Sequence, residues 1–384
     1  MFATSTFESL GVPNHFCQQL VSLGIEKPSL IQEKVIPLIK ENHSVLFQSE
    51  TGTGKTFAYL LPLLDKIDST NPNVQLIVVA PTHELAAQIK SQVKLVSEIK
   101  IALLIGGAPI KRQVELLKEK PQVVIGGPAR LAELVYLKKL KVAQIKHVVL
   151  DEADRLFSKE LKDSTLSLLN ELLGKIQIIA CSATITKQTE KTIASLLKNN
   201  QTAQIKTVLL PPEDILRKKI THVAIYSESR DKADTLRRLL AAEKPAKAMI
   251  FTSRGEQVEQ LASRLLHKKI NCCTLHAKSD KIKRKQSLDR FRSGKCNVLI
   301  TSDLAARGLD ISDITHIIQM DLPSNEDFFV HRAGRTGRAG KTGMNIVIGD
   351  GYEMNQLAQL EKKLKLVIYP RILYNGKLME PFQE

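Results

Sequence analysis

The chain has 384 residues, of which 43% are hydrophobic and 25% charged; this balance excludes a wholly disordered chain and predicts two or three domains. The formal net charge of +16 favours a polyanionic partner, although a solvated surface would also carry it. The five cysteines include no CxxC pair, so we expect neither a disulfide framework nor a zinc site. The N-terminus lacks the features of a signal peptide, and no apolar run reaches the ~20 residues of a membrane span. These observations predict a cytoplasmic protein without membrane association.

Short β-rich apolar runs recur along the chain, separated by amphipathic stretches of helical length. In the first half the predicted strands are Val45–Gln48, Gln75–Ala80, Ile101–Ile105, Gln122–Ile125, His147–Leu150 and Ile176–Ala180. In the second half they are His222–Tyr226, Ala248–Thr252, Cys272–Leu275, Val298–Thr301, His316–Met320 and Asn345–Ile348. Examples of predicted helices are Leu60–Ile67, Glu84–Lys100, Val258–Lys268 and Asn355–Val367. This alternation predicts α/β domains with doubly wound parallel sheets.

The predicted division of the chain lies at the segment 208–216, which contains Pro211 and Pro212. It separates a first domain, 1–207, from a second domain, 217–367, and residues 368–384 are expected to form a short tail. Polar or Gly-rich clusters follow many of the predicted strands, where ligands bind in open parallel sheets. Two such rims facing each other across the linker would form a cleft.

The segment Ser49–Thr56, SETGTGKT, follows an apolar strand and precedes a helical stretch, as a phosphate-binding loop requires. Gly52 and Gly54 allow backbone N–H groups to surround an anion at a helix N-terminus. Lys55 supplies positive charge for the β- and γ-phosphates, and Thr56 supplies a hydroxyl for Mg²⁺. Ser49 replaces the first Gly of the usual pattern. The segment predicts an ATP site that uses Mg²⁺.

Asp151-Glu152-Ala153-Asp154 follows another buried strand. Acidic residues at this position could cap the next helix. Beside a phosphate loop, Asp151 suits a Mg²⁺ ion that keeps most of its waters. Glu152 could orient and deprotonate the attacking water.

The second half is the more basic, with a net charge of +11 for residues 206–384 against +5 for residues 1–205. The basic run Lys278–Arg292 is explained either by a solvated helix face or by contact with phosphates. The segment His331–Arg338, HRAGRTGR, places arginines three apart, which puts them on one face of a predicted helix. These could form a basic surface helix or act as arginine fingers on the transferring phosphoryl group, making hydrolysis depend on closure of the two domains.

Taken together and in this order, these motifs resemble the DEAD-box ATP-dependent RNA helicases of helicase superfamily 2, from about Phe7 to Val347. The resemblance implies two tandem RecA-like domains. Gly24–Gln32 resembles the Q motif, so that Gln32 would hydrogen-bond the adenine, Ile25 would pack on the base, and Phe7 would be the upstream aromatic residue. The remaining residues that the resemblance assigns to the ATP site are Glu50, Thr51, Thr53, Gly308 and Asp310, the last at the ribose.

The same resemblance assigns catalytic, coupling and RNA-binding roles. The catalytic set is Lys55, Asp151, Glu152, His331, Arg335 and Arg338, with Arg335 and Arg338 at the γ-phosphate. The coupling set is Asp154, Ser182 and Thr184; Ser182-Ala183-Thr184 matches the SAT motif, although a polar strand end would look the same. The RNA-binding set is Pro81, Thr82, His83, Gly107, Arg130, Arg254, Arg284 and Ser302.

Three motifs depart from the family pattern, all on the RNA side. His83 replaces the Arg of PTREL, Gly127-Pro128-Ala129-Arg130 replaces TPGR, and Ser302 replaces the common Thr of motif V.

The resemblance implies a monomeric ATP hydrolase, stimulated by RNA, that locally separates short RNA duplexes or remodels ribonucleoprotein. Ribosome assembly or RNA turnover is the expected setting, with ribosomal particles or a specificity-giving protein as partners. An ATP-gated RNA clamp and a DNA helicase are the alternatives.

Overall fold

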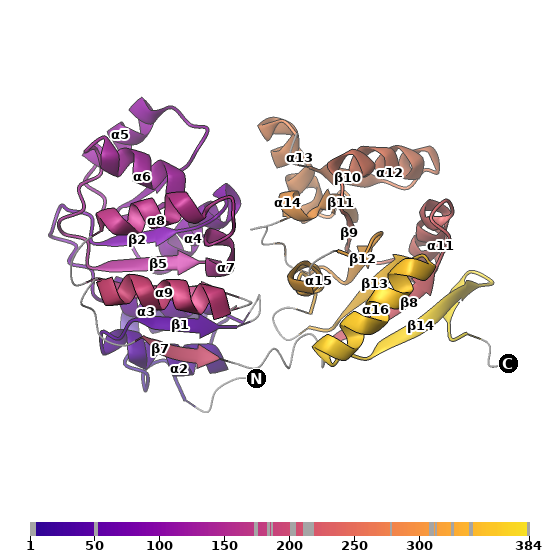
Figure 1. Ribbon diagram of the computed structural model, residues 1–384, viewed down its shortest axis with the longest axis horizontal. Coiled ribbons are helices and arrows are strands. Elements are labelled where there is room, and N and C mark those ends of the chain that lie inside the picture. Colours follow the sequence, from indigo (N-terminus) through magenta and orange to yellow (C-terminus); the bar gives the residue numbers. More distant parts are fainter. Residues whose placement is uncertain are drawn as a thin grey trace. The chain divides into compact units, whose positions relative to one another are not determined.

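The computed structural model describes residues 5–49, 53–172, 176–182, 185, 187–199, 205–209, 219–276, 279–306, 311, 313–323, 326–337 and 341–381. The chain divides into two compact units, Met1–Pro211 and Pro212–Glu384 (Figure 1). In the described residues, no helix has the length and apolar character needed to cross a membrane.

The first unit is built on a seven-stranded sheet in which every strand pair is parallel, in the order β3-β4-β2-β5-β6-β1-β7. Its strands are β1 (Val45–Gln48), β2 (Leu76–Val79), β3 (Ile101–Leu104), β4 (Val123–Gly126), β5 (His147–Asp151), β6 (Gln177–Ser182) and β7 (Lys206–Leu209). Its helices are α1 (Asn14–Ser22), α2 (Leu30–Lys40), α3 (Lys55–Leu64), α4 (His83–Val96), α5 (Ile110–Lys118), α6 (Pro128–Tyr136), α7 (Ala153–Leu156), α8 (Lys162–Glu171) and α9 (Lys187–Asn199).

Both faces of this sheet are buried, which explains why its strands are continuous apolar runs. Val45 and Phe47 of β1 pack in one core cluster with helices α1 to α4, whereas Leu46 between them packs in a second cluster with α6 and α8. Strands β5, β6 and β1 are neighbours, so the residues at their carboxyl ends lie together on one edge of the sheet.

The second unit has an eight-stranded sheet in the order β10-β11-β9-β12-β13-β8-β14-β15, parallel except for the β14–β15 pair. Its strands are β8 (Ile220–Tyr226), β9 (Ala248–Thr252), β10 (Cys272–Leu275), β11 (Val298–Ser302), β12 (His316–Gln319), β13 (Gly343–Gly349), β14 (Ile368–Tyr374) and β15 (Lys377–Met379). Its helices are α11 (Lys232–Glu243), α12 (Gly255–His267), α13 (Lys281–Arg292), α14 (Asp303–Ala306), α15 (Glu326–Ala333) and α16 (Gly351–Leu364).

Helices cover both faces of the second sheet. Ile346 and Ile348 of β13 pack in the cluster that includes α11 and α12, whereas Val347 packs in the cluster that includes α15 and α16. Figure 1 shows α16 across β13 and β8, consistent with its contacts to these strands.

Three strands were absent from the sequence prediction. Strand β7 pairs with β1, so Val208 and Leu209 belong to a sheet edge rather than to the predicted linker. Strands β14 and β15 occupy residues expected to form a tail, and β14 extends the sheet beside β8. Asn375 and Gly376, at the turn between these two strands, both have positive φ. A tight two-residue hairpin turn requires this conformation, and the Asn-Gly pair adopts it readily. Prediction missed β7 and β14 because most of their residues are exposed or only partly buried, so neither strand forms a buried apolar run.

Candidate functional site

The phosphate-loop segment runs from the end of β1 to the start of α3. Gly54 precedes α3 with φ of 89°, a left-handed conformation that favours glycine. The hydroxyls of Ser49 and Thr53 are 2.6 Å apart, and Lys55 Nζ donates to the Ser49 carbonyl at 2.6 Å. The two ends of the loop are therefore tied together around the start of a helix. Thr56 lies in the first turn of α3. The predicted ATP ligands Glu50, Thr51 and Gly52 lie outside the described residues.

Gln32 contacts this loop directly. Its side chain is only 3% exposed, its Oε1 accepts a hydrogen bond from the Ser29 N–H at 2.8 Å, and its Nε2 donates to the Gly54 carbonyl at 3.0 Å. A Cβ added at Gly54 would lie 2.5 Å from Gln32 Nε2 and would displace this amide, and the φ of 89° also favours glycine there. Phe7 and Ile25 pack in the core cluster of the same unit. The adenine contacts implied for Gln32 and Ile25 remain predictions.

Asp151, the last residue of β5, is buried and accepts three hydrogen bonds. Tyr59 Oη donates at 2.7 Å from α3, the Glu152 backbone N–H donates at 2.9 Å, and Cys181 Sγ donates at 3.1 Å from β6. All three donors are neutral, because burial and then the charge of Asp151 raise the pKa of Tyr59 and of Cys181 well above their ordinary values. Within the part of the chain that the structure describes, no cationic side chain forms an ion pair with Asp151.

The other predicted residues at this edge belong to the same arrangement. The Ser49 backbone N–H donates to the Ser182 carbonyl at 3.1 Å, which joins the phosphate loop to the end of β6. Glu152 adopts a left-handed conformation, with φ of 52° and ψ of 55°, immediately before α7. Its side chain makes no capping hydrogen bond to α7. Strained conformations of non-Gly residues concentrate at functional sites. Asp154 lies in the first turn of α7, whereas Thr184 is not among the described residues.

The predicted RNA-binding residues of the first unit follow β2, β3 and β4. Pro81 follows β2, and Thr82 caps α4, with its Oγ1 accepting from the Leu85 N–H at 3.3 Å. Arg130 of α6 donates to the Ala108 carbonyl at 2.9 Å and forms an ion pair with Glu133 at 2.9 Å. The guanidinium of Arg130 thus supports the loop after β3.

Two more of these residues lie in the same region. Gly107 in the loop after β3 has a φ of 75°. A Cβ added at its neighbour Gly106 would lie 3.7 Å from His83 Nε2. His83, one of the residues that depart from the family pattern, is therefore close to this loop.

The second unit is organised around Arg332, which is only 1% exposed. Its Nε and Nη2 donate to the two carboxylate oxygens of Asp303 at 2.6 and 2.7 Å. Its Nη1 donates to the Asp321 carbonyl at 2.8 Å and to Gln319 Oε1 at 3.2 Å, and the guanidinium lies 5.3 Å from the ring centre of Phe251. The carboxylate of Asp321 in turn accepts from the Ser253 N–H at 2.7 Å and from the Ser253 hydroxyl. One buried arginine therefore joins the ends of β9, β11 and β12.

The expectation that the motif VI arginines share a helical face is wrong for Arg335. Helix α15 ends at Ala333, so Arg335 lies in the turn that follows, whereas His331 lies in the last turn of the helix. Arg335 and Thr336 bond to the carbonyls three residues earlier at 3.1 Å each, and Gly337 has a φ of 68°. Gly334 and Gly337 favour this departure from the helix. Arg335 is 6% exposed. Arg338 falls outside the described residues, as do Gly308 and Asp310.

Three predicted RNA-binding residues complete the second unit. Ser302 is buried at the end of β11, and Arg254 is exposed just before α12. Arg284 of α13 donates to the Ala305 carbonyl of α14 at 3.0 Å, so its side chain helps to hold the loop after β11.

Sequence reasoning assigned no individual role to several residues of these networks: Tyr59, Cys181, Arg332, Asp303 and Asp321. Asp303 directly follows β11 inside motif V, and Arg332 lies in α15 inside motif VI. These positions could have indicated a role for both residues. Tyr59 and Cys181 occupy ordinary apolar-element positions, and only tertiary contact with Asp151 distinguishes them.

Comparisons with known proteins agree on the family. The sequence profile of the DEAD/DEAH box helicase family matches residues 29–193, and that of the helicase conserved C-terminal domain matches residues 231–340. The DEAD-box ATP-dependent RNA helicase CshC of Bacillus cereus is 36% identical over 360 residues, covering 93% of this chain and 91% of that protein. The probable ATP-dependent RNA helicase YfmL of Bacillus subtilis is 34% identical over 358 residues, covering 92% and 93%.

Solved structures show the same architecture over nearly the whole chain. Dbp5 of S. cerevisiae, bound to RNA and ADP BeF3, has a TM-score of 0.85 and 26% identity, covering 95% of each chain. Mss116p, bound to ssRNA and AMP-PNP, has a TM-score of 0.81 and 25% identity, covering 95% of this chain and 79% of that one. The two sheets of mainly parallel strands are those of tandem RecA-like domains, as predicted. With relatives more than 30% identical over more than nine-tenths of its length, the chain belongs to the DEAD-box ATP-dependent RNA helicase family.

Proposed function

We propose that this chain hydrolyses ATP in a reaction stimulated by RNA and uses the cycle to separate short RNA duplexes or remodel ribonucleoprotein locally. The observation that carries the proposal is the network around Asp151. Through Tyr59 it joins the helix of the phosphate loop, and through Cys181 it joins the strand that ends in Ser182. A movement of Asp151 in response to the bound nucleotide would thus act directly on the helix of the phosphate loop and on the strand that ends in Ser182.

Mg²⁺ fits the chemistry of this arrangement. The three hydrogen-bond donors to the buried Asp151 carboxylate are all neutral, and Thr56 adds a hydroxyl oxygen at the start of α3. Mg²⁺ prefers oxygen ligands and needs only one or two from the protein, because it keeps several waters. We assign Asp151 and Thr56 as the residues that hold it. When bound, it would neutralise charge on the β- and γ-phosphates.

The remaining chemistry is assigned to residues of both units. Lys55 and the loop amides hold the phosphates, and Glu152 orients and deprotonates the attacking water. Arg335 and Arg338 stabilise negative charge on the transferring phosphoryl group, which requires the second unit to close on the nucleotide held by the first. ATP then favours the closed state by its higher affinity for it, and product release reopens the site.

RNA is assigned as the nucleic acid because relatives matching nearly the full chain carry that activity in their names, and two of the similar structures contain RNA. Pro81, Thr82, His83, Gly107 and Ser302 lie in loops or at strand ends, where backbone phosphates are within reach. Contacts to phosphates carry no sequence information. We infer that RNA shape or a partner protein determines which RNA the chain acts on, for example the RNA of a ribosomal particle. We also infer that the chain is cytoplasmic and monomeric.

The decisive experiment compares ATP turnover without nucleic acid, with RNA, and with DNA of the same length, across a salt series. We expect stimulation by RNA that weakens as salt rises, because phosphate contacts release counterions. Equal stimulation by DNA would identify a DNA helicase. Turnover with no response to either polymer would contradict the proposal.

Three variants test the assigned roles. Lys55→Ala should abolish ATP binding or turnover. Glu152→Gln should bind ATP and RNA but hydrolyse about 10²–10⁴-fold more slowly, the usual contribution of a general base. Arg335→Ala should lower turnover about 10³-fold or more with little effect on ATP affinity. Strand separation of a short labelled duplex, measured in parallel, distinguishes a helicase from an ATP-gated clamp, which would hold RNA without releasing a strand.

A further inference from the structure

The second unit contains an open cavity of about 600 Å³ that none of the helicase motifs reaches. It lies at the carboxyl-terminal end of α11 and beside the segments that lead into β10 and β11. Its lining includes Leu240 from α11, Ile270 before β10 and Val298 at the start of β11. The predicted motifs follow the opposite, carboxyl ends of these strands. A five-residue strand such as β11 spans about 16 Å, so the cavity is separate from the motif residues at Ser302 and Asp303.

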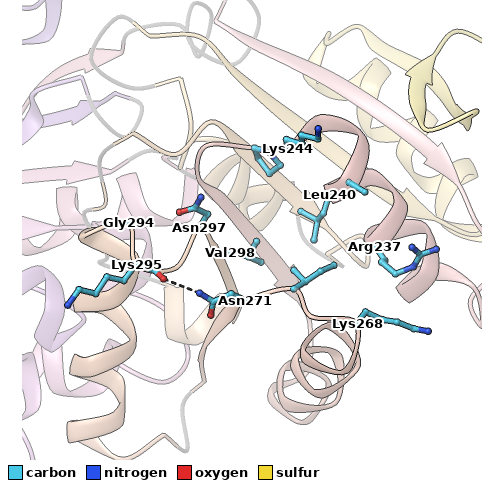
Figure 2. A pocket seen from close by; sticks show the side chains of 12 residues that line it. Arg237, Leu240, Lys244, Lys268, Asn271, Gly294, Lys295, Asn297 and Val298 are labelled. Atoms are coloured by element: carbon cyan, nitrogen blue, oxygen red, sulfur yellow. Dashed lines mark hydrogen bonds between the residues drawn. The ribbon is translucent and has the colours of Figure 1, made fainter.

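The cavity is strongly basic. Four of its lining side chains are cationic, Arg237, Lys244, Lys268 and Lys295, and none is acidic. Arg237 forms an ion pair with Asp234. The three lysines are exposed and have no ion-pair partner among the residues that the structure describes. In Figure 2 these lysines lie on different sides of the cavity lining, and Leu240 and Val298 lie between them.

Helix geometry accounts for only part of this charge. Lys244 and Lys268 are the C-cap residues of α11 and α12, where the helix dipole favours cations. Lys295 lies between α13 and β11 and ends no helix. A neighbouring hollow shares Arg237 and Lys268 and adds Arg230 and the acidic Asp234, together with Arg264 and His267 from the last turn of α12. Lys295 therefore adds a positive charge to the cavity that the capping of helices does not explain.

The cavity also contains groups that suit a base or a sugar. Leu240, Ile270 and Val298 provide an apolar floor. Asn297 is exposed, and its side-chain amide has no hydrogen-bond partner within the described residues. Asn271 is already fixed, since its Nδ2 donates to the Lys295 carbonyl at 3.0 Å and its Oδ1 accepts from Arg290 at 3.2 Å. Cations around an apolar floor with an available amide match phosphates, nucleobases and ribose hydroxyls.

We propose that this cavity, lined by Arg237, Lys244, Lys268, Lys295 and Asn297, is a second RNA-binding site of the chain. It would hold an RNA strand that extends beyond the segment bound at the motif loops. The proposal rests on the proposed function, because it assigns the same partner to a second surface. The phosphates contact the lysines and Arg237, and the aliphatic floor packs against a base or a ribose.

The test compares an RNA of about 6 nucleotides with one of about 30, since sites for single strands cover roughly 4–16 nucleotides. Binding is measured with the full chain and a non-hydrolysable ATP analogue, for wild type and for the double variant Lys268→Ala/Lys295→Ala. Loss of two phosphate contacts should reduce the slope of log affinity against log salt by about 1.4, since each contact to a single strand contributes about 0.7. At 0.1 M salt, taking 1 M salt as the reference, that slope corresponds to roughly 25-fold weaker binding of the long RNA. Binding of the short RNA and its stimulation of ATP turnover should not change.

The matched control is Lys362→Ala/Lys363→Ala, which removes two exposed lysines from α16 on the opposite face of the same sheet. This control should leave the affinity for both RNAs near wild type. A photoreactive 4-thiouridine in the long RNA should crosslink to the peptide that contains Lys295 and Asn297. Long-RNA affinity and salt slope that are unchanged in the cavity variant would overturn the proposal, as would an equal loss in the control. Failure of the proposed function would look different, because neither RNA would then stimulate wild-type turnover.

Discussion

The side-chain amide of Gln32 donates a hydrogen bond to the backbone carbonyl of Gly54, with 3.0 Å between Nε2 and the oxygen. The same amide accepts from the Ser29 N–H, so both of its ends are held inside the protein. Gln32 lies in α2, and Gly54 precedes α3. A residue that the family resemblance assigns to the adenine thus also positions the loop that is predicted to hold the phosphates.

Gln32→Ala should weaken nucleotide binding through the loop. Removing a buried hydrogen-bond partner costs about 1–3 kcal/mol, which corresponds to roughly 5–150-fold in affinity if the cost appears in binding. The affinities for ATP and GTP should both be measured by titration. An equal loss for the two nucleotides would assign Gln32 to loop support, whereas a loss confined to ATP would assign it to adenine contact.

Tyr59→Phe should lower ATP turnover about tenfold and the free energy of unfolding by about 1 kcal/mol, because it removes one of three donors to Asp151. If the hydroxyl orients the carboxylate for Mg²⁺, a higher Mg²⁺ concentration should restore part of the turnover. Tyr136→Phe is the control, since Tyr136 is 83% exposed. Equal turnover in the two variants at low Mg²⁺ would show that the Tyr59 hydroxyl has no role in positioning Asp151.

Arg332→Lys should destabilise the second unit, because a lysine cannot make the paired hydrogen bonds to Asp303 or reach Gln319 and Asp321 together. Breaking a buried ion pair typically costs about 3–5 kcal/mol. Urea unfolding followed by circular dichroism measures the change; the chain has no Trp for a fluorescence signal. Asp303→Asn should show a loss in the same transition, whereas Arg264→Lys, at an exposed position of α12, should not. Wild-type stability of Arg332→Lys would contradict the central role given to this arginine.

The stability of the first unit should fall as the pH decreases from 6.5 towards 4. Burial, and then the positive charge of Lys66, lower the pKa of His147 from 6.5 to about 4. Between these values the unfolded chain binds a proton that the folded chain does not, so acid favours unfolding in this window. At 1.36 kcal/mol per pKa unit, the shift at His147 contributes at most about 3 kcal/mol to the free energy of unfolding. This stabilisation is fully present above pH 6.5.

His147→Asn should remove most of this pH dependence. Urea unfolding of wild type and variant at several pH values between 4 and 7 tests it. Burial also lowers the pKa of His316 in the second unit, so the comparison with the variant isolates the share of His147. Parallel curves for the two proteins across the window would rule out the assigned effect.

The sequence by itself determined the elements whose information is local. Apolar runs of β-rich residues located twelve strands, because a strand buried on both faces must be apolar throughout. The segments SETGTGKT and DEAD could be placed at strand ends, since a turn between strand and helix has its own residue requirements. Family resemblance then supplied roles for particular residues, which local chemistry alone left open.

Tertiary structure decided which side chains meet. Tyr59, Asp151 and Cys181 are far apart in the sequence and come together only because α3 packs beside neighbouring strands. Strands β7 and β14 were not recognisable, since most of their residues are exposed or only partly buried and neither strand forms a buried apolar run. Lys268 and Lys295 likewise form one basic surface only when the loops before β10 and β11 lie side by side. Such contacts depend on strand order, which a residue pattern along one segment does not contain.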